Sequence, residues 1–444
     1  MKHTVTTEKI ICGGKGLART ASGQVIMSGL TLPGEVVELR ETGKKSGYLE
    51  GKLLRIITPS PARIRPRCPV YGECGGCDLQ HADYAEQLRI KKEIVEESLQ
   101  RAGVPFSGAE DTVPSPAQWG YRYRLRLKIS PAGQLSFFRK KSNKLVPIER
   151  CPAAAERINS ALARLNETGA LQPLAGICPE IELLQSPADG KITLVLRPAK
   201  QKKPPAAALR AVAGSLCIDQ IVDQIGWISR QGFRYIAPER QQQPLHQQIS
   251  LDKFVGFTGK SCSLFWSGGC FSQVNPGQNE QLIRLVCNLA GDLQGKTVLD
   301  LYCGMGNFSV PLGLCGGTVT GIESSRESVL QAEQNAELAG IRAGFFAADV
   351  SSSLHQLAEE GQQADLILLD PPRTGIGKAA ALLPALQPEK IIYVSCNPAT
   401  LARDLRTLQT AGYNVARLIP VDMFPQTAHI ETVALLQDTR SSSV

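Results

Sequence analysis

The sequence predicts a multidomain α/β protein that ends in a doubly wound, Rossmann-like domain. From about residue 263, short apolar runs of strand length alternate with helical stretches, as in a parallel sheet covered by helices. Residues 1–60 instead show short β-rich segments separated by glycines, the pattern of a small barrel. With 444 residues, 43% of them apolar and 20% charged, the chain is long enough for two or three domains. We therefore expect domains over residues 1–62, 63–262 and 263–444, the central one β-rich.

Residues 1–62 are predicted to form a small β-barrel of the OB-like kind. Glycines interrupt the apolar segments, and the turn Leu32–Glu35 leads into a strand at Val36–Leu39. This order of strands and turns resembles the TRAM module, and the resemblance implies binding to RNA. An unrelated small barrel that serves as a spacer is the alternative.

Positive charge is concentrated in the N-terminal part of the chain. Residues 1–265 carry 38 Lys and Arg against 24 Asp and Glu, a balance of +14. Residues 266–444 carry 11 against 17, a balance of −6, and the two balances sum to the net charge of +8. A basic region joined to an acidic α/β region indicates one part that grips a polyanion and one that carries the chemistry, although basic surfaces also occur without a nucleic-acid partner.

The chain has no feature that predicts export or membrane insertion. No apolar run reaches the length of a membrane span, and the first thirty residues mix charged residues with glycines where a signal peptide would have an apolar core. We therefore expect a cytoplasmic protein, a monomer without a membrane partner. Thirteen cysteines in such a chain indicate metal binding or catalysis, and not a disulfide framework.

Three cysteines, Cys68, Cys74 and Cys77, lie within ten residues in a glycine-rich loop and predict a metal site. The arginines of segment 63–67 would favour thiolates there. A fourth ligand is needed, and Cys151 is the best candidate because it lies at the end of a basic hairpin, whereas the other cysteines occur singly in apolar runs. Four thiolates can hold tetrahedral zinc or a [4Fe–4S] cluster, and the spacing leaves both open.

Between these cysteines, segment 121–128 alternates with a period of two. Its cations therefore share one face of a strand, and they are Arg122, Arg124, Arg126 and Lys128. Four more cations follow in segment 139–144, and no acidic residue occurs over residues 112–148. Because a solvated sheet face normally mixes both signs of charge, this basic stripe favours contact with a phosphate backbone.

The rest of the central region is less regular. Residues 200–205 and the glutamine-rich stretch 241–248 are predicted to be loops between β-rich pieces such as Ile192–Leu196.

Seven strands are predicted in the C-terminal domain. They are expected at Thr297–Leu301, Thr318–Ile322, Gly344–Ala347, Asp365–Leu369, Ile391–Ser395, Val415–Pro420 and Thr432–Leu436. Helical stretches between most of them predict a doubly wound sheet.

The first of these strands leads into a glycine loop, Asp300–Phe308, and the second is followed by Glu323. A loop of this kind at the end of a strand can admit a nucleoside, and a carboxylate after the next strand can hold ribose hydroxyls. The third position of a dinucleotide fingerprint is Ser309 and not glycine, so no pyrophosphate need be accommodated. This loop favours S-adenosylmethionine over NAD.

A cysteine lies at the end of the predicted strand Ile391–Ser395. The carboxyl ends of strands line the ligand crevice in open α/β sheets, so the thiol of Cys396 would meet whatever is bound there. This position suits a nucleophile.

Five stretches, taken in order, resemble the RNA uracil-C5 methyltransferases, the TrmA/RlmD family. They are Phe271–Asn275 with Asn279, Asp300–Phe308, Asp370–Arg373, Ser395–Pro398 and Asp422–Glu431. Together with the TRAM-like front and the four cysteines, the resemblance covers nearly the whole chain. It implies a methyltransferase fold in the C-terminal domain, S-adenosylmethionine as cofactor, and a [4Fe–4S] cluster at the four cysteines.

The resemblance also implies a set of residues around the cofactor. These are Gln273, Tyr302, Asn307, Glu323, Asp349 and Asp370. For Asp349, an ordinary helix N-cap explains the sequence nearly as well. Asp370 would orient the uracil edge, the cofactor or both.

The implied chemistry follows from the poor nucleophilicity of uracil C5. A thiolate, here that of Cys396, must add to C6 before C5 can take a methyl group, and a carboxylate, here Glu431, must then remove the C5 proton. The uridine must be single-stranded or flipped out of its helix.

The identity of the RNA stays open at this point. A front end of this kind resembles the enzymes that act on 23S ribosomal RNA, while transfer RNA or two ribosomal uridines remain alternatives. An adenine amino-methyltransferase would need neither Cys396 nor Glu431, and a radical methylthiotransferase would use C-x3-C-x2-C where this chain has C-x5-C-x2-C. A catalytically inactive RNA-binding or ribosome-assembly factor would keep the basic stripe but lose the active thiol.

Overall fold

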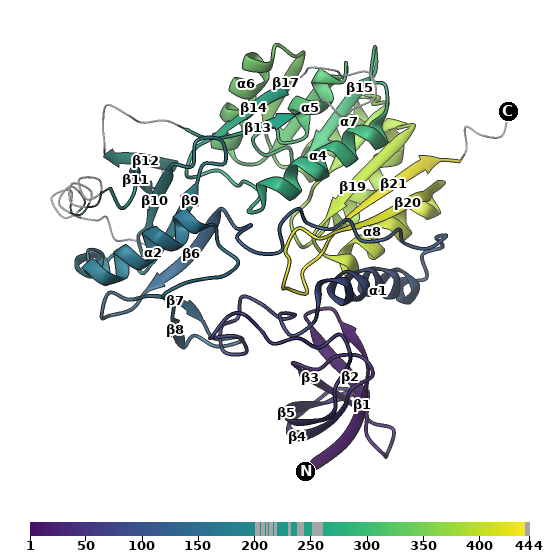
Figure 1. Ribbon diagram of the computed structural model, residues 1–444. Coiled ribbons are helices and arrows are strands. Elements are labelled where there is room, and N and C mark those ends of the chain that lie inside the picture. The colour runs from purple at the N-terminus through teal and green to yellow at the C-terminus, as the bar shows by residue number, and fades with distance from the viewer. Residues whose placement is uncertain are drawn as a thin grey trace.

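The computed structural model describes residues 1–199, 220–229, 232–237, 244–250 and 261–439, together with Pro205, Leu209, Val212 and Leu216. Figure 1 shows a barrel at the bottom of the view, a mixed sheet at the left and an α/β region at the upper right. In the part of the chain that is described, no helix combines the length and the apolar character that crossing a bilayer requires.

The N-terminal region is a closed five-stranded barrel, as predicted. The strands are β1 (Lys2–Ile11), β2 (Lys15–Arg19), β3 (Val25–Gly29), β4 (Val36–Lys45) and β5 (Tyr48–Thr58), in the order β1-β2-β3-β5-β4. The turn before β4 is fixed by Glu35, which is fully buried and accepts the N–H of Leu32 at 2.8 Å. Arg63, which follows β5 in the chain, pairs with this carboxylate, with 2.8 Å between Nη2 and Oε2. The turn and the end of the barrel are thereby tied together.

A seven-stranded sheet of order β12-β11-β10-β9-β6-β7-β8 forms the central region. Its elements are β6 (Arg124–Ile129), β7 (Leu135–Phe138), β8 (Leu145–Pro147), α2 (Glu156–Thr168), η1 (Gln172–Leu174), β9 (Glu180–Gln185), β10 (Ile192–Arg197), β11 (Gln224–Ser229) and β12 (Gly232–Ala237). Leu125 and Leu127 of β6 and Leu162 of α2 belong to one buried cluster, so the helix covers one face of the sheet.

An antiparallel pair of strands, β13 (Leu245–Ser250) and β14 (Ser261–Trp266), precedes the C-terminal region. The prediction of a loop over 241–248 is therefore wrong for residues 245–248, because Leu245, Gln247 and Ile249 alternate inward at strand period. Gln247 is tolerated there since its amide donates to the carbonyl of Pro276 at 2.8 Å. Residues 200–204 and 241–243 of the two predicted loops lie outside the described residues.

The C-terminal region is a doubly wound sheet of order β17-β16-β15-β18-β19-β21-β20. Strands β15 to β19 are parallel, and β21 is antiparallel to both of its neighbours. The elements are α4 (Pro276–Ala290), β15 (Thr297–Leu301), α5 (Ser309–Leu314), β16 (Thr318–Glu323), α6 (Arg326–Ala339), β17 (Ala343–Ala347), α7 (Val350–Glu359), β18 (Leu366–Leu369), η2 (Gly377–Leu386), β19 (Lys390–Ser395), α8 (Pro398–Thr410), β20 (Tyr413–Val421) and β21 (Glu431–Asp438). All seven predicted strands are present.

Helix α1 (Tyr84–Ala102) packs on the C-terminal sheet region although it lies far away in the sequence. Val95 and Leu99 are fully buried in the same core as Leu401 and Leu405 of α8. Figure 1 shows α1 between the barrel and α8. The helix begins at Asp83, whose carboxylate accepts the N–H of Glu86 at 2.8 Å. It therefore links the first region of the chain to the last.

Candidate active site

Strand pairing brings Cys396 and Glu431 together at one edge of the C-terminal sheet. Ser395, the last residue of β19, pairs with Thr432 of antiparallel β21. Cys396 directly follows Ser395, and Glu431 directly precedes Thr432. The two residues therefore face each other across the ends of neighbouring strands. Asp370 directly follows β18, which pairs with β19 in parallel, and so it reaches the same edge.

The turn that carries Cys396 is held by hydrogen bonds. Ser395 Oγ accepts the N–H of Asn397 at 3.2 Å, and Asn397 Oδ1 caps α8 by accepting the N–H of Ala399 at 3.2 Å. Asn397 Nδ2 donates to the carbonyl of Arg373 at 3.0 Å. The half-buried thiol is therefore fixed between the starts of two loops, those after β18 and β19.

The thiol of Cys396 is protonated at neutral pH in the resting protein. Burial raises its pKa to about 11, the charges of Glu431 and Asp370 act in the same direction, and the Arg373 guanidinium lowers it. Arg373 thus favours the thiolate of Cys396, while the two carboxyl groups oppose it.

Glu431 is buried, and its pKa is raised well above the usual range of a glutamate, first by burial and then by the charge of Asp370. Burial also raises the pKa of Asp370, to about 7. Two interacting carboxyl groups of this kind retain a proton near neutral pH. Glu431 can therefore act as a base only after that proton has moved to Asp370 or to solvent.

Strand β15 ends in the predicted glycine loop. Tyr302 has a left-handed backbone, with φ of 66°, and its N–H donates to the carbonyl of Ile322 in β16 at 2.8 Å. A non-glycine residue in this conformation stores strain, as is common at ligand sites. Glu323, the last residue of β16, accepts the N–H of Gly304 at 3.3 Å and that of Ser325 at 2.8 Å. The loop and the carboxylate thus form one unit.

Asp300 lies beneath this loop and is fully buried. Ser309 donates a hydrogen bond to Oδ2, while Oδ1 has no hydrogen-bond partner among the described residues. Burial raises the pKa of Asp300 to about 7, and the charge of Asp370 adds to the effect. The sequence analysis gave this carboxyl no role, although its position just before the glycine loop was visible.

Asn307 and Gln273 approach from the side of α4. The side-chain amides of Asn307 and Asn279 exchange two hydrogen bonds, of 2.9 and 3.0 Å. The side chain of Gln273 is half-buried and makes no hydrogen bond to any described residue. Asn275 between them caps α4, and its amide also donates to the carbonyl of Met423 at 3.2 Å. This segment therefore connects the glycine loop to the loop before Glu431.

Asp349 is exposed and forms the N-cap of α7. Its Oδ1 accepts the N–H of Ser352 at 2.9 Å and the hydroxyl of the same residue at 3.0 Å. These bonds lower the pKa of the Asp349 carboxyl. The N-cap explanation offered by the sequence is thus sufficient for its position in the fold.

Arg373, which the sequence motif Asp370–Arg373 contains but to which no role was assigned, also lies at this site. Its charge acts on the pKa values of Cys396, Glu431 and His429, so it lies near all three. The signal was its place directly after Asp370 and two prolines, which fix the direction of the chain.

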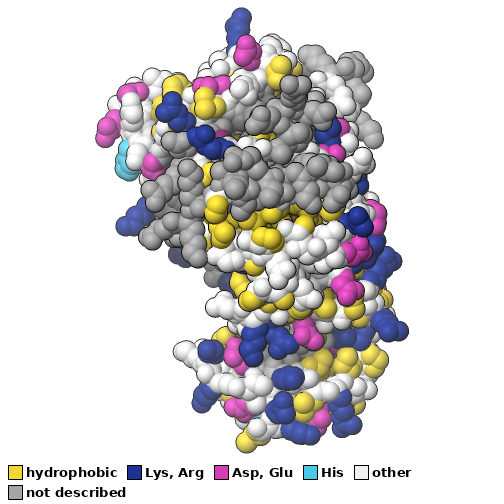
Figure 2. Space-filling model, turned by 90° about the vertical axis from the view of Figure 1, so that its left-hand side faces the viewer, with side chains coloured by type: hydrophobic (Ala, Val, Ile, Leu, Met, Phe, Trp, Pro, Cys, Tyr) yellow, Lys and Arg dark blue, Asp and Glu magenta, His cyan; other side chains and the backbone are white. Residues whose placement is uncertain are grey.

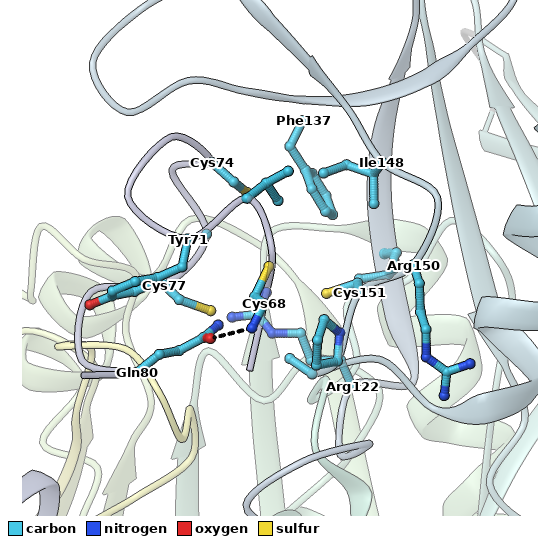
Figure 3. Close-up of a pocket in the computed structure, with 15 residues that line it drawn as sticks. Cys68, Tyr71, Cys74, Cys77, Gln80, Arg122, Phe137, Ile148, Arg150 and Cys151 are labelled. Carbon is cyan, nitrogen blue, oxygen red and sulfur yellow. Dashed lines mark hydrogen bonds between the residues drawn. The ribbon is translucent and has the colours of Figure 1, made fainter. Parts of the chain in front are cut away.

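The four predicted metal ligands line one pocket beside the central sheet (Figure 3). In that view, Cys77 and Cys151 point toward each other from opposite sides, with Cys68 between them. Arg122 lies behind these thiols, and the remaining wall is mostly apolar, with Val70, Leu125, Phe137 and Ile148. Burial raises the pKa of the Cys68, Cys74 and Cys77 thiols.

Four thiols are the donor type of an iron–sulfur cluster, and they line one pocket with mostly apolar walls. Among the described residues, however, no group of three or more His, Cys, Asp or Glu side chains is arranged to hold a metal ion. The expectation that the arginines of segment 63–67 favour thiolates is wrong for Arg63 and Arg67 and is not tested for Arg65. Arg63 pairs with Glu35, Arg67 lies over the ring of Trp119 at 5.1 Å, and the cation beside the cysteines is Arg122.

The basic stripe of β6 faces one side of the sheet, as predicted, but it is not free of acidic partners. Strand β9 lies beside it and brings Glu180 and Glu182 opposite the cations. Arg124 binds Glu182 at 2.7 Å, and Arg126 and Lys128 both bind Glu180. The interpretation of an unmixed positive face is therefore wrong. Figure 2 shows Lys and Arg instead spread over the lower part of the molecule, at the level of the barrel.

Comparison with known proteins places these features in context. The family described as tRNA (Uracil-5-)-methyltransferase matches residues 83–439. The chain is 34% identical to the 23S rRNA (uracil(1939)-C(5))-methyltransferase RlmD of Azoarcus sp. (strain BH72), over 98% of this chain and 99% of that protein. It is 32% identical to an uncharacterized RNA methyltransferase of Aquifex aeolicus (strain VF5), over 98% of each.

A solved structure has the same fold over the whole chain. The tRNA (uracil-54, C5)-methyltransferase of Pyrococcus abyssi, in complex with S-adenosyl-L-homocysteine, superposes with a TM-score of 0.72 and 24% identity. The match covers 98% of this chain and 99% of that structure. The barrel, the central sheet and the C-terminal sheet therefore recur together in one known protein.

Proposed function

The chain belongs to the tRNA (uracil-5-)-methyltransferase family, and from that premise we propose that it methylates C5 of a uridine in 23S ribosomal RNA. It is an S-adenosylmethionine-dependent RNA uracil-C5 methyltransferase. The observation that carries the proposal is the position of Cys396 opposite Glu431 at the sheet edge, beside Asp370. The choice of ribosomal RNA rests on the likeness to the RlmD protein over nearly the whole chain. Transfer RNA is the second candidate, since the Pyrococcus abyssi protein of the same fold acts on it.

Each residue has one task in the proposed reaction. S-adenosylmethionine supplies an electrophilic methyl group. After the thiol of Cys396 has lost its proton to solvent, the thiolate forms a bond to uracil C6. The electron pair displaced onto C5 takes up the methyl group, and the cofactor would leave as S-adenosylhomocysteine. Glu431 then removes the proton from C5, and that electron pair restores the C5–C6 double bond as the thiolate leaves. The uracil ends with one methyl group in place of one proton, and Cys396 is regenerated.

We propose that the cofactor lies along the edge of the sheet between the glycine loop and Asp370. The residues proposed to hold it are Gln273, Tyr302, Asn307, Glu323, Asp349 and Asp370. The strained backbone of Tyr302 and the orientation of Glu323 by Gly304 and Ser325 support this assignment. The amide of Gln273, which makes no hydrogen bond to any described residue, is available to a ligand.

The substrate is tested by mapping 5-methyluridine in total RNA from cells that lack the gene. We expect one ribosomal position to lose its methyl group. Returning the wild-type gene to these cells should restore the methyl group. Returning a Cys396→Ala copy, which supplies the protein without the proposed nucleophile, should not. Loss of methylation only in transfer RNA would overturn the ribosomal assignment and leave the chemistry intact.

We propose that Cys68, Cys74, Cys77 and Cys151 bind a [4Fe–4S] cluster that has a structural role, because methyl transfer through a thiolate adduct requires no electron. Protein purified without oxygen should contain iron and acid-labile sulfide at about four each per chain. Cys151→Ser should lose both, whereas Cys12→Ser, which changes an exposed cysteine outside the pocket, should keep both. Stoichiometric zinc without sulfide would contradict the cluster.

A further inference from the structure

The loop over residues 422–430 carries the chain from β20 to Glu431, and its ends are held differently. Its start is fixed by Asp422, which is fully buried and pairs with the equally buried Lys91 of α1. The hydroxyl of Tyr84 also donates to Asp422 Oδ2 at 2.9 Å. A buried, fully paired carboxylate of this kind holds its segment in one place. The second half of the loop, next to Glu431, is held partly by Gln87 of α1, which exchanges two hydrogen bonds with Gln426, of 2.9 and 3.1 Å. Its remaining contacts come from outside α1.

The first of these contacts comes from the loop that carries the cysteines. The two residues after Cys77 donate their backbone N–H groups to the carbonyl of Gln426, Asp78 at 3.0 Å and Leu79 at 2.9 Å. The carboxylate of Asp78 also accepts the N–H of Ala428 at 3.4 Å. Gln426 has a φ of 70°, which a residue with a side chain adopts only when its surroundings hold it there. The cysteine loop supplies part of that restraint.

The second contact runs through Tyr121 and Arg122. Tyr121 is buried, and its hydroxyl donates to the carbonyl of Pro425 at 2.9 Å. The same hydroxyl accepts a hydrogen bond from Arg122 Nε at 3.2 Å. Arg122 lines the pocket of the four cysteines. The carbonyl of Pro425 is therefore linked to the cysteine site through Tyr121, and the carbonyl of Gln426 through the backbone after Cys77.

We propose that Tyr121 and Asp78 are positioning residues that place Glu431 by holding the 422–430 loop against the four-cysteine loop. The proposal rests on the proposed function, in which Glu431 removes the C5 proton. It assigns the cysteine site a task inside the methylation cycle. Without its two contacts, the second half of the loop keeps the bonds from Gln87 but is held less firmly, and the carboxylate reaches the methylated uracil less often. Thiol addition and methyl transfer precede that step and depend on Cys396, so they continue.

The test is Tyr121→Phe, which deletes one hydroxyl and keeps the ring, in the full chain with its metal site loaded. We expect kcat to fall about tenfold or more, as for loss of a buried hydrogen bond, with KM for RNA within about threefold. A covalent complex between protein and RNA should accumulate on denaturing gels. Amide hydrogen exchange in a peptide covering residues 422–431 should be faster than in the wild type.

Tyr123→Phe is the matched control, because this neighbouring hydroxyl makes no hydrogen bond to any described residue. It should leave kcat, the covalent complex and the exchange rate unchanged. Asp78→Ala removes the bond to Ala428 and should have the same effects as Tyr121→Phe. It tests the proposal independently if Tyr121→Phe folds poorly. Cys151→Ser should accelerate exchange in the same peptide.

Two outcomes separate this proposal from the proposed function. If Glu431→Gln accumulates the covalent complex but Tyr121→Phe and Asp78→Ala accumulate none and exchange like the wild type, the positioning role is wrong and the reaction scheme stands. If Glu431→Gln also accumulates none, Glu431 is not the base, and the proposal fails with the scheme on which it rests.

Discussion

Replacing Cys396 with alanine is expected to abolish methylation, with a loss of at least about 10³-fold in kcat/KM. Without a thiolate to add to C6, uracil C5 has no electron density to offer an electrophile, so no slower route through the same site remains. Affinity for S-adenosylmethionine should change by less than about threefold, since Cys396 is not among the residues proposed to hold the cofactor. Single-turnover methyl transfer and equilibrium binding of the cofactor measure the two quantities.

The control for this variant is Cys287→Ala. Cys287 is a buried cysteine of α4 with no role in the proposed reaction, and its loss should leave the rate close to that of the wild type. Activity of Cys396→Ala within tenfold of the wild type would eliminate Cys396 as the nucleophile.

The raised pKa of the Cys396 thiol should make the rate of adduct formation depend on pH. Because burial and two carboxyl groups raise the pKa of Cys396 to about 11, the thiolate is the minor form at pH 7. As long as the pH stays below that pKa, each rise of one pH unit increases the thiolate fraction about tenfold. The rate of adduct formation should therefore rise from pH 7 to pH 9. A flat profile over this range would show that bound RNA has already ionised the thiol.

The second large effect is expected for Glu431→Gln. The amide keeps the size of the side chain but cannot take a proton, so thiol addition and methyl transfer proceed while release fails. We expect turnover to drop at least about 10²-fold and a covalent protein–RNA complex to persist on denaturing gels. The RNA in that complex should already carry the methyl group from labelled S-adenosylmethionine.

Two further variants make this result specific. The double variant Cys396→Ala, Glu431→Gln should form no complex, because the bond to C6 is missing. Glu389→Gln changes an exposed carboxylate outside the site and should turn over normally. Normal turnover of Glu431→Gln without a trapped complex would assign the proton to another group.

Much of the catalytic region could be predicted from the sequence because parallel strands end at a common edge. The end of a strand is indicated by the apolar run that stops at Ser395 and by the glycine loop after Leu301. The fold then brings these strand ends together. The four cysteines were grouped correctly for a different reason: they are chemically unlike their neighbours, and the structure places all four around one pocket.

Other features depend on partners that no local pattern reveals. The cations of β6 looked unopposed because Glu180 and Glu182 come more than fifty residues later and meet them only through strand pairing. In the same way, the pairing of Arg63 with Glu35 and that of Lys91 with Asp422 join distant segments. Charge patterns along a chain report which charges are present, whereas tertiary contacts decide which remain unpaired.

The packing of α1 on α8 also has a consequence for synthesis of the protein. Arg406 of α8 reaches the carbonyl of Ala102 at a sequence separation of 304 residues. A ribosome adding about 5–20 residues per second needs roughly 15–60 s to cover that distance. Throughout this interval, Val95 and Leu99 lack α8, against which they are buried in the folded protein. The apolar face of segment 84–102 is therefore exposed on the nascent chain, where chaperones can bind it. The C-terminal sheet then completes its core only by recruiting a helix made long before it.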